Sequence, residues 1–310
     1  MNVRSNVLNM AGNCEKLLPV SEKLASIGVD PCTGMSIIGH CAAARILHSL
    51  GIEVAQNRLL AAAITEPQGG SDLRGVRTVF AGGEDWRVTG AKVFATNALY
   101  ADSIIVYGLL NGEAALAYVE PGSVGVRIEP MELTVYKCSG IASIAFDSAP
   151  ASPIDKPGRR IYRSVLQGLA ENRVLVAALA VGLGRTILDR AVEWAIERGV
   201  AKYQAVTHRI ARAHALLEAA AAMVSKTAET IDREGLSDWT LTSIAKYTAT
   251  EAAVEAARAA RRTLGGHTYS RVGEEIVSLQ HHIHALEPAE GTQDIQLEII
   301  ARTILQKKRA

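Results

Sequence analysis

The stretch AITEPQGGSD, residues 63–72, ends a run of small apolar residues and opens into a polar loop with two glycines. Exposed backbone N–H groups and hydroxyls in such a loop can hold a planar or phosphorylated ligand. Ser71 and Asp72 can equally cap only their own backbone, so both interpretations stay open. Further on, RVTGAKVFATN, residues 87–97, has the pattern of a hairpin arm followed by a half-buried strand.

The sequence pattern around these two stretches, from about residue 59 to residue 152, is typical of a β-domain. Short runs rich in Val, Ile, Thr and Tyr alternate there with turn residues. Gly82-Gly83 and Asn111-Gly112 each separate two such runs, which is the signature of a β-hairpin. The sequence therefore predicts an antiparallel β-barrel or sandwich in this segment.

Helical patterning flanks this segment on both sides. Before it, residues 35–50 carry apolar residues along one side, with Gly51 as a C-cap. After it, an alanine-rich chain predicts long helices over 160–198, 204–233, 238–263 and 293–307, and a shorter one near 273–285. Long helices joined by short links predict an antiparallel four-helix bundle. The fold class is thus α+β and multidomain, with a short helical region at 1–58, a β-domain at 59–152 and a helical bundle at 153–310.

Bulk composition excludes several classes of function. Lys plus Arg number 33 and Asp plus Glu 32 among 310 residues, so charge supports neither a nucleic-acid nor a membrane-surface role. The longest apolar run, residues 174–183, is too short to span a bilayer. The four cysteines (Cys14, Cys32, Cys41 and Cys138) are widely and irregularly spaced, which predicts neither a zinc site nor a disulfide framework and fits a reducing cytoplasm.

Three further strings in the helical region contain residues that could take part in catalysis or ligand binding. Glu290 begins EGTQDIQ, where Thr292 reads as the N-cap of the last helix and the helix dipole stabilises a nearby carboxylate. Gly265-Gly266 follows a long helix and serves either as a C-cap or as a point of close approach for a ligand. His281 and His284 are one turn apart, but no further ligand set accompanies them, so no metal site is predicted.

Taken together, the strings resemble those of FAD-dependent acyl-CoA dehydrogenases. TEPxxGSD followed by G-x-K-x-(aromatic)-x-TN is similar to the family's β-domain motifs, with Phe94 where relatives usually carry tryptophan. Arg173, Ala177, Ala178 and Gly182 match the family's R-x-x-x-A-A-x-x-x-G, and residues 290–296 match its E-G-T-x-x-(I/L)-Q. The resemblance covers nearly the whole chain from about residue 30, and the motifs occur in the family's order.

The resemblance implies roles for individual residues. Glu290 would abstract the α-proton of an acyl-CoA thioester, and the β-hydride would pass to FAD. FAD would contact Thr65, Ser71, Phe94, Thr96, Arg198, Gln204, Arg262, Gly265, Gly266, Thr292 and Asp294. The substrate would contact Ser71, Arg173 and Gly291. An electron-transfer flavoprotein would accept the electrons, and FAD shared between subunits would require a homodimer or homotetramer.

The chain also departs from the family pattern. It resembles an N-terminally shortened member, Ala170 replaces a family aspartate, and residues 198–204 form a shortened loop on the adenine side of the FAD. Asn172 occupies the position at which some relatives carry the catalytic glutamate. The expected function is that of a cytoplasmic acyl-CoA dehydrogenase in fatty acid metabolism. A non-catalytic acyl-CoA dehydrogenase-like subunit and an acyl-CoA oxidase are the alternatives.

Overall fold

The computed structural model describes residues 3–12, 14–70, 72–83, 85–236 and 238–307. The chain divides into two compact units. The first comprises Met1–Glu15 and Cys32–Asn172, and the second comprises Lys16–Pro31 and Arg173–Ala310. Along the chain, helices come first, then strands, then helices again, which is the order that composition predicts. The boundaries of the three predicted domains stay a prediction.

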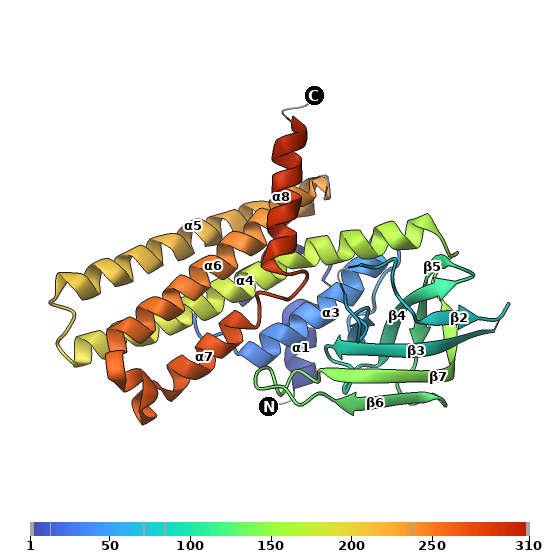
Figure 1. Cartoon of the computed structure of the whole chain (residues 1–310), viewed down its shortest axis with the longest axis horizontal. Coiled ribbons are helices and arrows are strands. Elements are labelled where there is room, and N and C mark those ends of the chain that lie inside the picture. Colours follow the sequence, from blue (N-terminus) through green and yellow to red (C-terminus); the bar gives the residue numbers. More distant parts are fainter. Residues whose placement is uncertain (1–2, 13, 71, 84, 237, 308–310) are drawn as a thin grey trace. The chain divides into compact units, whose positions relative to one another are not determined.

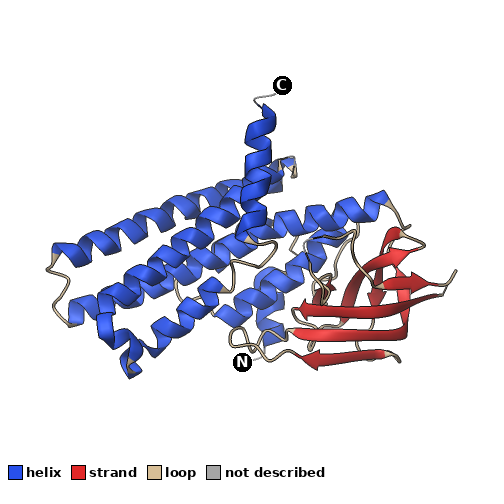
Figure 2. Cartoon of the chain, in the orientation of Figure 1, coloured by secondary structure: helices blue, strands red, loops and turns tan. Residues whose placement is uncertain are grey.

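A seven-stranded sheet dominates the first unit and appears in red in Figure 2. It contains β1 (Leu60–Ala63), β2 (Val79–Ala81), β3 (Trp86–Ala95), β4 (Ser103–Leu110), β5 (Glu113–Val119), β6 (Val126–Pro130) and β7 (Ala142–Pro153). The pairings run β4-β2-β3-β7-β5, and β5 pairs with β4 again, so these five strands close into a barrel-like ring. Phe80 and Trp86 lie among the buried residues of its core, with ring centroids 5.3 Å apart.

Both predicted hairpins are present in the sheet. β2 pairs antiparallel with β3 across the Gly82-Gly83 turn, and β4 pairs antiparallel with β5. Asn111 and Gly112 both have positive φ, 52° and 83°, as a two-residue turn between twisted strands requires. The expectation of a purely antiparallel sheet was wrong, because β4 runs parallel to both β1 and β2. These parallel partners are joined by long connections, and turn signals in the sequence report only on strands joined by short ones.

In the described part of the first unit, the helices are α1 (Val3–Ala11), α3 (Pro31–Ser49) and the first part of α4 (Arg159–Glu197). α3 ends where predicted, and Gly51 follows it with φ 77°. Gly168 of α4 allows close contact with α3, because a Cβ there would lie 2.6 Å from the Ile46 side chain. Gly39 allows α3 to approach the sheet closely, because a Cβ at this position would lie 2.6 Å from the Thr96 side chain.

All four cysteines form disulfides, so the prediction of no disulfide framework was wrong. Cys14 pairs with Cys41 and Cys32 pairs with Cys138, with Cα atoms 5.3 and 5.5 Å apart. The sequence separations are 27 and 106 residues, so only the tertiary packing brings each pair within bonding distance. The cysteine argument for a reducing compartment therefore no longer holds, and a cytoplasmic location stays a prediction.

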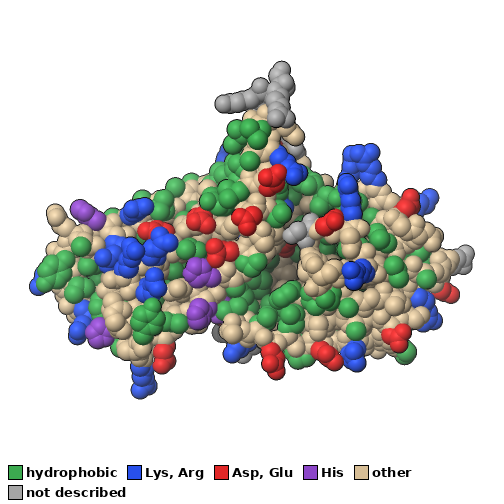
Figure 3. Space-filling view, viewed as in Figure 1, with side chains coloured by type: hydrophobic (Ala, Val, Ile, Leu, Met, Phe, Trp, Pro, Cys, Tyr) green, Lys and Arg blue, Asp and Glu red, His purple; other side chains and the backbone are tan. Residues whose placement is uncertain are grey.

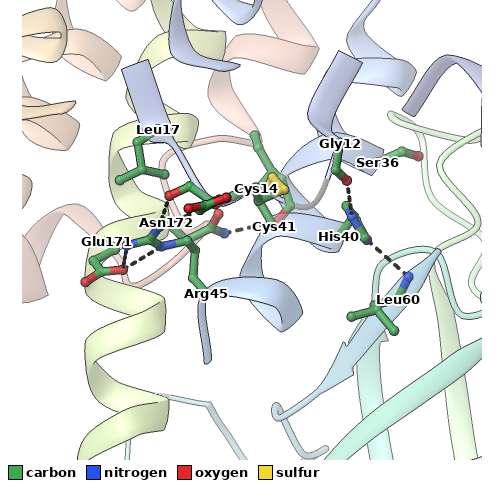
Figure 4. Close-up of a disulfide and its surroundings, with 12 residues drawn as sticks. Gly12, Cys14, Leu17, Ser36, His40, Cys41, Arg45, Leu60, Glu171 and Asn172 are labelled. Carbon is green, nitrogen blue, oxygen red and sulfur yellow. Dashed lines mark hydrogen bonds and ion pairs between the residues drawn. A yellow bond between two sulfur atoms is a disulfide. The ribbon is translucent and has the colours of Figure 1, made fainter. Parts of the chain in front are cut away.

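His40 lies beside the first disulfide and is completely buried (Figure 4). Its Nδ1 accepts a hydrogen bond from the Leu60 N–H at 3.2 Å, so the ring proton is on Nε2, which donates to Gly12 O at 3.0 Å. Burial lowers the pKa of His40, opposed by the bond to Gly12. The neutral ring thus joins α3, the segment after α1 and β1 in one hydrogen-bonded unit.

Acidification is expected to destabilise the first unit through His40. The unfolded chain takes up a proton as the pH falls through 6.5, the ordinary pKa of histidine, while the folded chain resists protonation until lower pH. The free energy of unfolding should therefore fall below pH 6.5 by up to about 1.4 kcal/mol per pH unit from this group. Urea unfolding at a series of pH values measures the slope. His40→Gln should reduce the slope of unfolding free energy against pH. His208→Gln, at an exposed position on the long helix 204–234, is the control and should keep the wild-type slope. Equal slopes in all three proteins would contradict the role of His40.

The second unit is helical. Its elements are α2 (Leu17–Leu24), the rest of α4, α5 (Gln204–Glu234), α6 (Trp239–Leu264), α7 (Glu274–His284) and α8 (Gln293–Lys307), with two short 3-10 turns, Gly265–Tyr269 and Arg271–Gly273. The five helices predicted after residue 160 agree with the observed bounds to within one residue or two. α5 packs along α6, which also contacts α7 and α8 (Figure 1). The finer expectation of an antiparallel four-helix bundle stays a prediction.

Close packing in this unit depends on α4. A Cβ at Gly182 would lie 2.1 Å from Leu24 O, so glycine is needed for α2 to approach α4. The N-terminus of α2 is capped from α5, because the Asp232 carboxylate accepts hydrogen bonds from the N–H groups of Leu17 and Leu18 at 2.8 and 2.9 Å. Among the described helices, none combines the length with the apolar character that crossing a bilayer requires.

Candidate active site

The TEP loop of the first unit is organised around a buried ion pair. Glu66 is 2% exposed and Lys92 is fully buried, and their charged groups are 2.8 Å apart. The Glu66 carboxylate also accepts hydrogen bonds from the N–H groups of Arg77 and Thr78, at 2.7 and 2.9 Å. Lys92 Nζ donates a second bond to Ile64 O at 3.0 Å. The glutamate of TEP and the lysine of G-x-K are therefore partners, which explains why both strings occur together.

Both partners are ionised in the folded protein at neutral pH. Burial opposes ionisation of Glu66, but the bonds from Lys92, Thr78 and the backbone N–H groups outweigh it and lower the pKa of Glu66 to about 2. Burial lowers the pKa of Lys92 to about 8, opposed by the hydrogen bond and charge of Glu66. Removing one partner of such a pair leaves an uncompensated buried charge. The ion pair thus fixes the loop that carries Thr65.

Next to this loop, the end of β3 presents an aromatic face to solvent. The pairing of β3 with β7 shifts register between Lys92 and Ala95, and Phe94 lies in that bulge with φ 55°. Bulges re-aim side chains, and Phe94 is 56% exposed. Val93 N donates to Thr65 O at 2.9 Å, which joins the bulge to the TEP loop. Thr65 and Thr96 are both half-buried, and an exposed ring with partly exposed hydroxyl side chains fits a flat heteroaromatic group such as a flavin. Ser71 lies outside the described residues.

In the second unit, Glu290 lies on the loop between α7 and α8. Glu290 has φ 52° and Gly291 has φ 95°, so two successive residues adopt the left-handed region. A Cβ at Gly291 would lie 2.9 Å from Gln296 Nε2. Thr292 caps α8 as predicted, since its Oγ1 accepts from Ile295 N at 3.4 Å. Glu290 itself is half-buried.

Three buried side chains from three helices hold the backbone carbonyls of this loop. Arg173 of α4 donates from Nε to Glu290 O at 3.2 Å. Gln296 of α8 donates to Glu290 O at 3.3 Å and to Gly291 O at 3.0 Å. Lys246 of α6 donates to Glu287 O at 2.5 Å and to Gly291 O at 2.9 Å. The main chain on both sides of Glu290 is thus fixed.

The other residues implied for FAD are exposed. Arg198, Gln204, Arg262, Gly265, Gly266, Thr292 and Asp294 all belong to the second unit and all have exposed surfaces. Gly265 is the C-cap of α6, with φ 59°, and open space surrounds both it and Gly266. The C-cap interpretation is therefore confirmed, while the open space leaves room for a ligand. Figure 3 shows a group of basic side chains on the visible face of the helical elements, with acidic side chains next to it.

Glu171 forms a buried ion pair with Arg45. It lies two residues before Arg173, which binds the carbonyl of Glu290. Glu171 is 2% exposed. Its carboxylate accepts from Arg45 Nε at 2.6 Å and from Gln167 Nε2 at 3.0 Å, and Figure 4 shows the arginine pair. Asn172 Nδ2 donates to Ile38 O at 3.2 Å. Neither side chain is placed to act as a base, so neither competes with Glu290 for that role.

The structure gathers the predicted residues into two sets. Thr65, Phe94 and Thr96 belong to the first unit, and the remaining described candidates belong to the second. Sequence reasoning assigned no role to Glu66, Lys92, Lys246 or Gln296. A local signal was available for Lys246, which lies among the small, mostly apolar residues of SIAKYTATEAA, residues 243–253. A lysine in such a pattern is expected to be buried, and a buried lysine needs a polar or charged partner.

Two family models match the chain. "Acyl-CoA dehydrogenase, middle domain" matches residues 61–149, and "Acyl-CoA dehydrogenase, C-terminal domain" matches residues 162–305. The long-chain specific acyl-CoA dehydrogenase, mitochondrial, of Sus scrofa is 30% identical over 265 residues, covering 80% of this chain and 61% of that protein. The 3-(aryl)acrylate reductase of Clostridium sporogenes is 28% identical over 273 residues, covering 80% of this chain and 69% of that protein. The chain thus spans about three fifths of the length of the mitochondrial relative.

Solved structures show the same fold. A glutaryl-coenzyme A dehydrogenase in complex with glutaryl-CoA superposes with a TM-score of 0.84 at 24% identity, covering 93% of this chain and 79% of that one. Butyryl-CoA dehydrogenase from Megasphaera elsdenii gives a TM-score of 0.81 at 20% identity, covering 98% of both chains. The mixed α+β architecture with a barrel-like sheet is therefore confirmed.

Proposed function

The chain belongs to the acyl-CoA dehydrogenase family, and from this premise we propose that it catalyses the FAD-dependent α,β-dehydrogenation of an acyl-CoA thioester. The observation that carries the proposal is the fixed loop at Glu290. Its backbone conformation is unusual for a non-glycine residue, and buried donors from α4, α6 and α8 hold it. Strained backbone that the surroundings over-determine is typical of active sites.

In the proposed reaction, Glu290 acts as general base. Its carboxylate takes the proton from the α-carbon of the thioester, and its backbone N–H donates to the thioester oxygen on which negative charge develops. Gly291 has no side chain, so the acyl group can approach the loop closely. Arg173 holds the loop and is also proposed to contact the substrate.

FAD supplies the acceptor for the β-hydride when it is bound. We assign Thr65 and Thr96 to the edge of the flavin ring and Phe94 to the shielding of its face, where an aromatic side chain excludes water. Ser71, Thr292 and Asp294 complete this set. Arg198, Gln204, Arg262, Gly265 and Gly266 would hold the adenine and pyrophosphate end, with Arg262 contributing charge.

The proposal extends to partners and location. Electrons would leave to an electron-transfer flavoprotein, and a homodimer or homotetramer would place Arg198 and Gln204 against the FAD of a second copy. We keep the proposal of a cytoplasmic fatty-acid enzyme without membrane insertion.

An absorption spectrum of the purified protein, recorded anaerobically before and after addition of a panel of acyl-CoAs, tests the function. A flavin band that bleaches with one acyl-CoA is the expected result and identifies the substrate class. Rapid oxygen consumption by the reduced protein without an added carrier would favour an acyl-CoA oxidase. A colourless protein that takes up no added FAD would favour the non-catalytic subunit and overturn the proposal.

A further inference from the structure

We propose that Lys246 is a positioning residue for Glu290, because its buried ammonium group holds the loop that carries Glu290 in one conformation. The inference rests on the proposed function only where it concerns proton abstraction. The holding of the loop stands on the geometry of α6 and the α7–α8 connection alone.

The donors and acceptors at this position match in number. Lys246 is fully buried, and its three N–H groups face three oxygens: Glu287 O at 2.5 Å, Gly291 O at 2.9 Å and Gln293 Oε1 at 2.9 Å. An ammonium group has three donors and no acceptor. The three oxygens lie before and after Glu290 in sequence, so Lys246 ties the two ends of this turn together.

Gln293 extends the network into α6. Its Nε2 donates to Thr250 Oγ1 at 2.7 Å and to Glu251 Oε1 at 3.1 Å. The amide is therefore oriented with its oxygen towards Lys246, and the first residue of α8 is tied to α6 at two positions. Arg173 and Gln296 hold the carbonyl of Glu290 itself, but neither bonds to Glu287. Lys246 therefore holds the chain before Glu290 as well as Gly291, on both sides of the residue whose backbone is left-handed.

The charges around Lys246 make this contact sensitive to pH. Arg173 of α4 faces it, as do Glu287 and Glu290 of the loop, and Glu251 of α6 lies beyond Gln293. Burial, followed by the charge of Arg173, lowers the pKa of Lys246 to about 8, opposed by the two loop carboxylates. A neutral amine has two donors and a lone pair, so deprotonation leaves one of the three oxygens without its bond. The loop should therefore be held below pH 8 and loosened above it.

Hydrogen exchange measured by mass spectrometry tests the holding of the loop without any catalytic readout. In the wild-type protein, exchange of the amides in residues 287–293, corrected for the intrinsic pH dependence, is expected to accelerate about tenfold as the pH rises through 8. Lys246→Met should show the fast exchange at every pH. Lys226→Met, at an exposed position on α5, is the matched control and should behave as wild type. Uniform exchange in all three proteins would overturn the inference.

Kinetics then test the link to Glu290. Lys246→Met is expected to lower the rate of flavin reduction about 10²-fold, the scale of a misplacement of about 1 Å, while the half-saturating acyl-CoA concentration changes less than about threefold. The wild-type rate should fall above pH 8, and this alkaline limb should be absent in Lys246→Met. Lys246→Gln retains two amide donors and should lose less rate but also lack the limb. Wild-type rates with an unchanged limb, or a loss confined to substrate affinity, would overturn the positioning role.

The two proposals fail in different ways. If no acyl-CoA reduces the wild-type protein, the proposed function fails, and the exchange experiment still decides whether Lys246 holds the loop. If Lys246→Met does not fold, the pH dependence of exchange in the wild-type protein carries the test alone.

Discussion

Replacing Glu290 by Gln is expected to lower the rate of α-proton removal about 10³-fold, within the range of about 10²–10⁴-fold that a positioned general base contributes. Glutamine has the same size and keeps the backbone carbonyl that Arg173 and Gln296 bind. The loop should therefore stay in place while the basic oxygen is lost. Acyl-CoA binding should change little, since the substitution removes an interaction needed in the transition state.

Exchange of the α-hydrogen of a bound acyl-CoA with solvent deuterium measures this step directly. Anaerobic flavin reduction should fall in parallel. Glu298→Gln is the matched control, because Glu298 is an exposed carboxylate on α8 paired with Arg302, and it should exchange at the wild-type rate. Full activity of Glu290→Gln would place the base elsewhere. Glu171 would not be the substitute, because Arg45 and Gln167 already bind its carboxylate in a buried position.

The sequence predicted the local features of the fold well because each depends on nearby residues. Asn111-Gly112 specifies a turn with two positive φ values, and that hairpin is present. Helix bounds after residue 160 follow from composition and capping in the same way. The parallel pairing of β4 with β1 and β2 was missed because it joins strands that are distant along the chain. Local patterns carry no information on such pairings.

The same limit applies to the candidate site. Glu290 itself was identified from a family motif, but two of the groups that hold its loop lie far away in sequence: Arg173 is 117 residues from Glu290, and Lys246 is 45 residues from Gly291. Lys92 and Lys246, both buried, were not assigned roles because burial is a tertiary property. A lysine inside an apolar pattern is the one local hint of a buried ionic contact.

Removal of the Cys32–Cys138 disulfide is expected to cost about 4.8 kcal/mol of unfolding free energy. The chain-entropy relation gives this value for a closed loop with a separation of 106 residues, against about 3.6 kcal/mol for Cys14–Cys41 with its separation of 27. The Cys32–Cys138 bridge joins the beginning of α3 to the β6–β7 connection, where Ser139 Oγ also donates to Cys32 O at 3.0 Å. Its loss therefore removes the covalent link between these two segments.

Urea unfolding of the double variants Cys32→Ser/Cys138→Ser and Cys14→Ser/Cys41→Ser, each with and without reductant, measures both effects. The difference between the two variants should be about 1.2 kcal/mol, since only the logarithm of loop length separates them. Alkylation of the denatured, unreduced wild-type protein followed by mass spectrometry provides the chemical control and should label no cysteine. Four labelled cysteines, together with a stability that does not respond to reductant, would show that the pairs are thiols. In that case the spacing argument for a reducing compartment would regain its force.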